Sequence, residues 1–144
     1  MAVTGSRREA RERALGLCYE LEVRDLGVDA LIEQQPAPPD EYAERLVRGV
    51  EEHSADVDEL LRKFSEHWAL ERMPAVDRAV LRLGAYELGW EPEIPSAVVI
   101  SEAVELAKQY STKDSGRFVN GLLSRIAEEL RPAGTAGSAE VPGS

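Results

Sequence analysis

Four arginines near the start of the chain form its densest group of hydrogen-bond donors. They occupy positions 7, 8, 11 and 13, within the sequence RREARER. On a helix that turns roughly 100° per residue, Arg7, Arg8 and Arg11 share one arc beside the apolar residues, and Arg13 lies across the helix. A guanidinium can hold a phosphate through two parallel hydrogen bonds, so this arc could bind phosphates. The alternative, which the residues alone favour, is a solvated helix start whose charge two interleaved glutamates balance.

A second candidate site lies in the segment DSGRFVN, residues 114–120. Asp114 is a residue type that caps helices, which would be a sufficient structural reason for it. Arg117 lies off the apolar stripe and Phe118 on its edge, and an aromatic ring beside an arginine can stack on an unpaired RNA base. Gly121 costs a helix about 1 kcal/mol relative to Ala, which hints at close approach of another helix or a ligand. The alternative is that Phe118 belongs to the core and Gly121 accommodates a neighbouring helix.

Arg78 and Arg82 are four residues apart and therefore share one face of a helix. Both cannot lie deep in a core. We expect them to pair with Glu71, Glu102 or Glu105, or to line an interface.

The histidines and the cysteine do not form a catalytic or metal-binding pattern. His53 and His67 are fourteen residues apart and have no cysteine or acidic neighbours at a zinc-type spacing. Cys18 lies on the apolar stripe of the first predicted helix, where cysteines are commonly buried and inert. The sequence also contains no Gly-rich phosphate loop, nucleophile elbow or HExxH motif. We therefore expect no enzyme activity, no metal and no cofactor.

Composition points to one acidic, helical protein. The chain has 144 residues, and 27 acidic against 17 basic side chains give a net charge of −10, which disfavours non-specific nucleic-acid binding. Runs of β-branched and aromatic residues are scarce, which predicts an all-α fold. No apolar run reaches the roughly 20 residues that a membrane span needs. A single cysteine cannot form an intramolecular disulfide, so a cytoplasmic location is expected.

Apolar periodicity and helix-breaking residues predict about seven helices. The first begins at Arg7 and breaks at Gly27. The expected remainder are a short helix over 28–35, one capped by Asp40, one that begins at Ser54 or Asp56, one from Pro74 to about Trp90, one capped by Ser96, and one from Asp114 to Pro132. The predicted helix from Pro74 to about Trp90 is apolar around much of its circumference, which predicts a central helix surrounded by others. Tyr110 and Leu130 are expected to face inward.

Three segments carry a resemblance to a known family. Residues 76–88 read VDRAVLRLGAYEL, residues 94–113 read IPSAVVISEAVELAKQYSTK, and residues 114–123 read DSGRFVNGLL. In this order and spacing they resemble the signature of the bacterial NusB family, small helical proteins of transcription antitermination. The resemblance covers roughly residues 7–130. With the helix pattern it implies two packed helical subdomains, 7–53 and 54–131, between a disordered segment 1–6 and a disordered tail 132–144.

The resemblance also implies a function and its residues. NusB proteins bind boxA-type RNA cooperatively with the ribosomal protein NusE in the antitermination complex of RNA polymerase. An arginine-rich N-terminal segment contacts this RNA, and Arg7, Arg8 and Arg11 fall on it, although Glu9 stands where the family often has a basic residue. The family motif near the bound RNA implies further contacts by Arg117 and Phe118, with a weaker claim for Asn120. Homodimers also occur in NusB-like proteins.

Two other functions stay open at this point. RNA cytosine methyltransferases carry an accessory domain similar to NusB, and a purely protein-binding helical adaptor needs no RNA at all. The face that would receive NusE is not given by the sequence. A basic protein would suit the acidic residues of the middle helices, although a solvated acidic face explains them equally well; they are Glu41, Glu44, Glu51, Asp58 and Glu59.

Overall fold

The computed structural model describes residues 6–66 and 69–132, and within these ranges the fold is all-α. The helices are α1 Arg7–Val23, α2 Val28–Glu33, α3 Glu41–Glu52, α4 Ser54–Phe64, the single-turn 3-10 helix η1 Leu70–Arg72, α5 Ala75–Trp90, α6 Ser96–Tyr110 and α7 Ser115–Leu130. The predicted fold class is confirmed, and η1 was not predicted. His67, residues 1–5 and all but the first residue of the expected tail lie outside the described residues.

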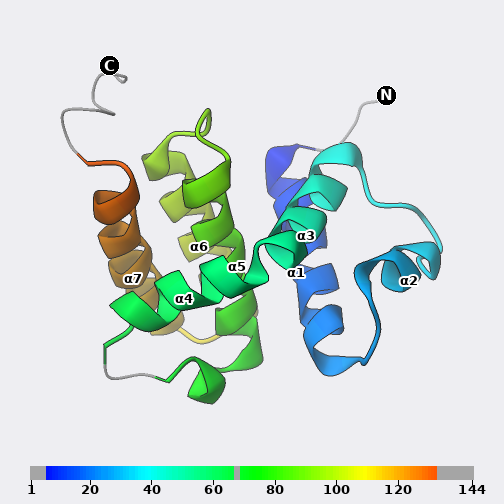
Figure 1. Ribbon diagram of the computed structural model, residues 1–144, viewed down its shortest axis with the longest axis horizontal. Coiled ribbons are helices and arrows are strands. Elements are labelled where there is room, and N and C mark those ends of the chain that lie inside the picture. The colour runs from blue at the N-terminus through cyan, green and yellow to red at the C-terminus, as the bar shows by residue number, and fades with distance from the viewer. Residues whose placement is uncertain (1–5, 67–68, 133–144) are drawn as a thin grey trace.

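Helix α5 is the centre of the fold. It packs against α1 and α3 on one side and against α4, α6 and α7 on the other (Figure 1). The prediction of a central helix is confirmed, because apolar side chains on several faces of α5 are buried. Among them are Val80, Leu81, Leu83, Ala85 and Leu88.

The buried apolar side chains form one continuous cluster that draws on every α-helix. The predicted boundary between two subdomains falls between His53 and Ser54, where α3 ends and α4 begins with no loop between them. The His53 ring stacks on that of Trp90 at the end of α5, with 4.5 Å between the ring centroids. The junction is therefore fixed to the central helix, and the division into subdomains stays a prediction.

The first helix begins with a reciprocal cap. The Ser6 side chain accepts a hydrogen bond from the Glu9 backbone N–H at 3.1 Å, and the Glu9 carboxylate accepts one from the Ser6 N–H at 3.0 Å. This capping box gives Glu9 a structural role at the start of α1. Asp40 caps α3 as predicted, because its carboxylate accepts the Ala43 N–H at 2.8 Å.

Two of the other predicted caps are wrong. Asp114 stands just before α7, but its side chain makes no capping hydrogen bond. The hydroxyl of Ser115, the first residue of α7, accepts a hydrogen bond from the Thr112 N–H of the preceding loop at 3.3 Å. Ser96 is the first residue of α6, and Pro95 precedes it in the cap position.

The inward positions of α6 and α7 were also predicted with two errors. Tyr110 and Leu130 are exposed, because each lies in the last turn of its helix, beyond the packed surface. Gly121 is not a point of close approach, since a Cβ there would lie 3.9 Å from its nearest neighbour, Arg125 of the same helix. The close approach occurs at Gly116, where a Cβ would lie 2.9 Å from Lys108 Cγ on α6.

Candidate nucleic-acid interface

Arg7 and Arg8 lie exposed in the first turn of α1, as the sequence predicted. The Arg7 guanidinium stacks over the Tyr42 ring of α3, with 4.1 Å between Cζ and the ring centroid. Arg8 binds the Glu102 carboxylate of α6 through two hydrogen bonds of 3.0 and 2.8 Å. This pairing raises the pKa of Arg8 and lowers that of Glu102. Both cations face solvent, and only Arg8 would have to exchange a carboxylate for a phosphate.

Arg11 does not belong to this exposed pair, and the prediction that it shares their surface is wrong. The residue is 4% exposed. Its guanidinium binds the Glu87 carboxylate of α5 at 3.0 and 2.9 Å, and the Tyr42 hydroxyl donates to the same carboxylate at 2.5 Å. Burial by itself lowers the pKa of Arg11, but the hydrogen bonds and charge of Glu87 outweigh it and raise the pKa. Helix α1 packs against both α3 and α5, so a wider arc of it is covered than its apolar stripe indicated.

The second predicted group lies around the first turns of α7. Arg117 is exposed, and its side chain makes no hydrogen bond or ion pair within the described part of the chain; the same holds for the side chain of Lys113, just before the helix. Asn120 is exposed, and its side-chain oxygen Oδ1 accepts a hydrogen bond from the Ser124 hydroxyl one turn later, at 3.1 Å. Phe118 is half-buried and packs against the hydrophobic core. The sequence reasoning missed Lys113, which could have been found because it adjoins the segment DSGRF.

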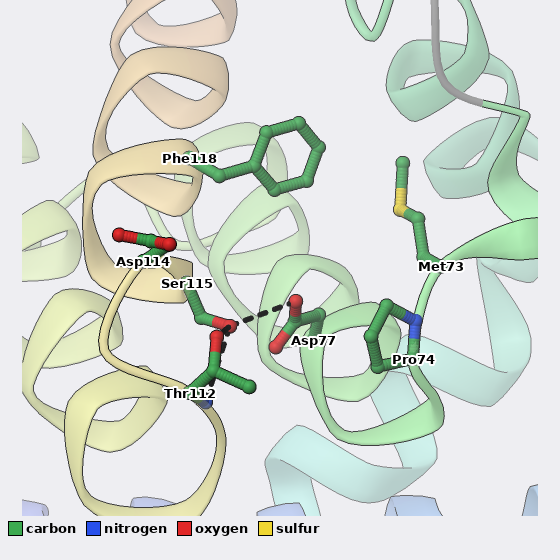
Figure 2. A pocket seen from close by; sticks show the side chains of 7 residues that line it. All are labelled: Met73, Pro74, Asp77, Thr112, Asp114, Ser115 and Phe118. Carbon is green, nitrogen blue, oxygen red and sulfur yellow. Dashed lines mark hydrogen bonds between the residues drawn. The ribbon is translucent and has the colours of Figure 1, made fainter.

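Phe118 also forms one wall of a pocket of about 260 Å³ between the start of α5 and the α6–α7 loop (Figure 2). Met73 and Pro74 form the facing wall. Asp77 of α5 also lines the pocket and is 5% exposed. Its Oδ2 accepts a hydrogen bond from the Ser115 hydroxyl at 3.0 Å, whereas Oδ1 is the one buried side-chain oxygen or nitrogen in the described residues without a partner. The pocket thus combines mostly apolar walls with a buried carboxylate oxygen that has no hydrogen-bond partner in the described residues.

Both exposed cationic groups adjoin α6. Arg8 reaches α6 at Glu102, and Gly116 of α7 packs against α6 at Lys108. Six residues of helix separate these two points, which is about 9 Å along its axis. The exposed residues among the predicted RNA contacts therefore form two separate groups, one at the start of α1 and one at the start of α7.

Arg78 and Arg82 do not pair with any of the three glutamates considered from the sequence. Both bind Glu22 near the end of α1, and Arg82 also binds Asp58 of α4 at 2.8 and 3.0 Å. Arg78 donates further to the backbone carbonyls that precede α5, those of Leu70 and Met73. The two arginines join α1, α4, η1 and α5, so their role is structural.

Comparison with known proteins identifies the family of this chain. The family model described as the NusB family matches residues 8–128. The chain belongs to the NusB family. The transcription antitermination protein NusB of Thermobifida fusca is 50% identical over 129 residues, which cover 87% of this chain and 91% of the relative. The protein of the same name from Sorangium cellulosum is 48% identical over 132 residues, with 88% and 94% covered.

Solved structures of the NusB family share the fold. NusB of T. maritima superimposes with a TM-score of 0.79 at 38% identity, over 88% of this chain and 94% of that one. A crystal structure of the antitermination factors NusB and NusE in complex with double-stranded RNA matches with a TM-score of 0.74 at 29% identity, over 85% and 96%. The described part of the chain has no helix long and apolar enough to cross a membrane, and no cluster of acidic, histidine and cysteine side chains suited to a metal.

Proposed function

We propose that this chain is a transcription antitermination factor that binds boxA-type RNA together with NusE. The observation that carries the proposal is the exposure of two cationic groups, at the starts of α1 and α7, on a chain of net charge −10. The named relatives and the NusB–NusE–RNA complex support it. The mechanism is assembly in the cytoplasm, with no bond made or broken.

The proposed RNA contacts are those of the two groups without Arg11. Arg7 and Arg8 would hold phosphates at one end and Arg117 at the other, with Lys113 added beside it. Phe118 would stack on a base, and Asn120 would donate a hydrogen bond from its amide. Arg11 is left out because Glu87 already occupies its guanidinium inside the protein.

We place the docking site for NusE at the pocket around Asp77. Two of the five residues of the acidic face considered from the sequence are paired with arginines, since Glu44 binds Arg48 and Asp58 binds Arg82, each at 2.8 Å. Asp77 Oδ1 is instead a buried acceptor without a partner, between apolar walls that suit the stem of a lysine or arginine. RNA stacked on Phe118 would then adjoin the docked protein, which gives cooperative binding a physical basis.

The test of the function is a titration of labelled boxA-type RNA with this chain, with NusE and with both, at one fixed salt concentration. A coupling free energy of typical size would make the mixture bind about 5- to 150-fold more tightly than the stronger single component. RNA binding no better in the mixture would reject cooperative assembly. RNA-independent binding of NusE would then favour the protein-binding adaptor.

Charge reversal tests the RNA contacts. Arg7→Glu with Arg8→Glu should weaken RNA binding and flatten its log–log salt slope by about 1.4, since each phosphate contact contributes roughly 0.7 for single strands. Arg24→Glu with Arg62→Glu makes the same change at exposed arginines elsewhere and serves as the control. Equal losses in the two variants would mean that only overall charge matters.

A conservative substitution tests the docking site. Asp77→Asn removes the charge and keeps the shape, and it should weaken NusE binding about tenfold or more, because a charged hydrogen bond is lost. Glu59→Gln on the exposed acidic face of α4 is the matched control. A larger loss in Glu59→Gln than in Asp77→Asn would move the partner to the acidic face.

A further inference from the structure

We infer that Tyr42 is a positioning residue for RNA binding, because its ring holds the Arg7 guanidinium in place for a phosphate. This inference rests on the proposed function. Tyr42 lies in α3, far from Arg7 in the sequence, and neither the arginine-rich segment nor the DSGRFVN segment includes it.

The geometry leaves the binding edge of Arg7 free. A guanidinium that lies over an aromatic ring is held by the cation–π contact and can still donate its N–H groups to a phosphate. The Arg7 Cζ lies 4.1 Å from the ring centroid, and Arg7 makes no ion pair with a carboxylate in the described part of the chain. Arg8 differs, since Glu102 already occupies its N–H groups.

The Tyr42 ring is fixed by a hydrogen bond to a buried carboxylate. The Tyr42 hydroxyl donates to the buried Glu87 carboxylate at 2.5 Å, and Arg11 binds the same carboxylate through two of its nitrogens. Tyr42 is half-buried, and burial together with Glu87 raises the pKa of its hydroxyl, which therefore stays a donor. Through Glu87, the buried Arg11 thus helps to fix the Tyr42 ring, and the exposed Arg7 lies over that ring.

Such support matters because an arginine loses rotamer freedom when it binds. Ordering one long side chain costs enough to change affinity about two- to twelvefold, and a side chain already held in place avoids much of this cost. Tyr42→Leu should therefore weaken binding of boxA-type RNA about two- to twelvefold in the presence of saturating NusE. Tyr42→Phe keeps the ring and should keep at least about half of the affinity.

A double-mutant cycle separates positioning from a general loss of structure. Arg7→Ala, Tyr42→Leu and the double variant are compared with the parent chain, with thermal midpoints measured for all four. Because Tyr42 acts through Arg7, Tyr42→Leu should change affinity less than about twofold once Arg7 is Ala. Phe64→Leu is the control, since Phe64 is also half-buried under an exposed cation, with Lys63 Nζ 5.3 Å from its ring centroid.

The outcomes distinguish a failure of the proposed function from a failure of the positioning role of Tyr42. No RNA binding by the parent chain with NusE would overturn the proposed function and the inference together. RNA binding that falls in Arg7→Ala, combined with an equal effect of Tyr42→Leu in both backgrounds, would overturn the inference and leave the function standing. An equal loss in Phe64→Leu would likewise show that ring removal acts through stability alone.

Discussion

Removal of Arg11 should destabilise the protein far more than removal of its exposed neighbour Arg8. The side chains of Arg11 and Glu87 are 5% and 2% exposed, and three contacts of 2.9 to 3.2 Å join them. Arg11→Ala leaves the Glu87 carboxylate buried with the Tyr42 hydroxyl as its remaining hydrogen-bond partner. Breaking a buried pair in this way costs about 3–5 kcal/mol, chiefly because the remaining charge is uncompensated.

The free energy converts into a measurable shift of the thermal midpoint. About 125 folded residues give an unfolding entropy of about 0.26 kcal/mol/K, so the midpoint should fall by about 11 to 19 °C. Circular dichroism during heating measures it. Arg8→Ala is the control and should leave the midpoint nearly unchanged, because its side chain is 60% exposed.

A further variant tests the cause of the loss. Glu87→Gln combined with Arg11→Ala removes the orphaned charge and should recover part of the stability lost in Arg11→Ala alone. A midpoint for Arg11→Ala within a few degrees of that for Arg8→Ala would refute the reasoning and return Arg11 to the candidate phosphate contacts.

Three other properties should follow from buried groups and packing. Burial and the Glu91 carboxylate raise the pKa of Tyr86 to about 12, so its contribution to the free energy of unfolding is complete below pH 10 and is lost as pH rises towards 12. Unfolding curves of Tyr86→Phe should therefore lose this part of the dependence of stability on alkaline pH. An unchanged dependence would contradict the assignment. Burial raises the pKa of the Cys18 thiol to about 12, so a thiol reagent should label it only in unfolded protein, and rapid labelling of the native chain would show that α1 opens. Gly121→Ala should stabilise the chain by about 0.4–1 kcal/mol in denaturant titrations. Gly49→Ala should destabilise it, because a Cβ would lie 2.3 Å from the Tyr86 ring. Destabilisation by Gly121→Ala, or stabilisation by Gly49→Ala, would show that α7 or α3 packs differently.

The helices could be predicted from the sequence because their signals are local. Proline, glycine and cap residues mark most of the ends, and apolar periodicity marks the faces that pack. Helix α5 was predicted to be central because its apolar residues cover several faces, and five helices pack against it. At α6 the error is a choice between adjacent residues, because Pro95 and not Ser96 holds the cap position. Asp114 does hold the cap position of α7, but its side chain makes no capping hydrogen bond.

The buried acids could not be predicted in this way. Glu87 and Glu91 lie in the same segment of sequence, and a helical wheel shows only that they are polar. Each is buried because an arginine from another helix reaches it: Arg11 from α1 binds Glu87, and Arg45 from α3 binds Glu91 at 2.6 and 2.9 Å. Pairs separated by 46 to 76 positions leave no periodic signal in the sequence.

The same pairs explain why so few of the 17 basic side chains are available to RNA. Arg11 and Arg45 compensate buried carboxylates, and Arg78 and Arg82 join helices through Glu22 and Asp58. Arg131 is also used internally, where it donates to the backbone carbonyls around the end of α5, those of Glu87, Leu88, Glu91 and Ile94. Five of the fourteen arginines therefore join helices or compensate buried carboxylates, and the few exposed cations at the starts of α1 and α7 could neutralise only a few phosphates. An acidic chain with so small a cationic surface gains RNA affinity most effectively from a basic partner docked beside it, and this is the physical reason to expect NusE and RNA to bind cooperatively.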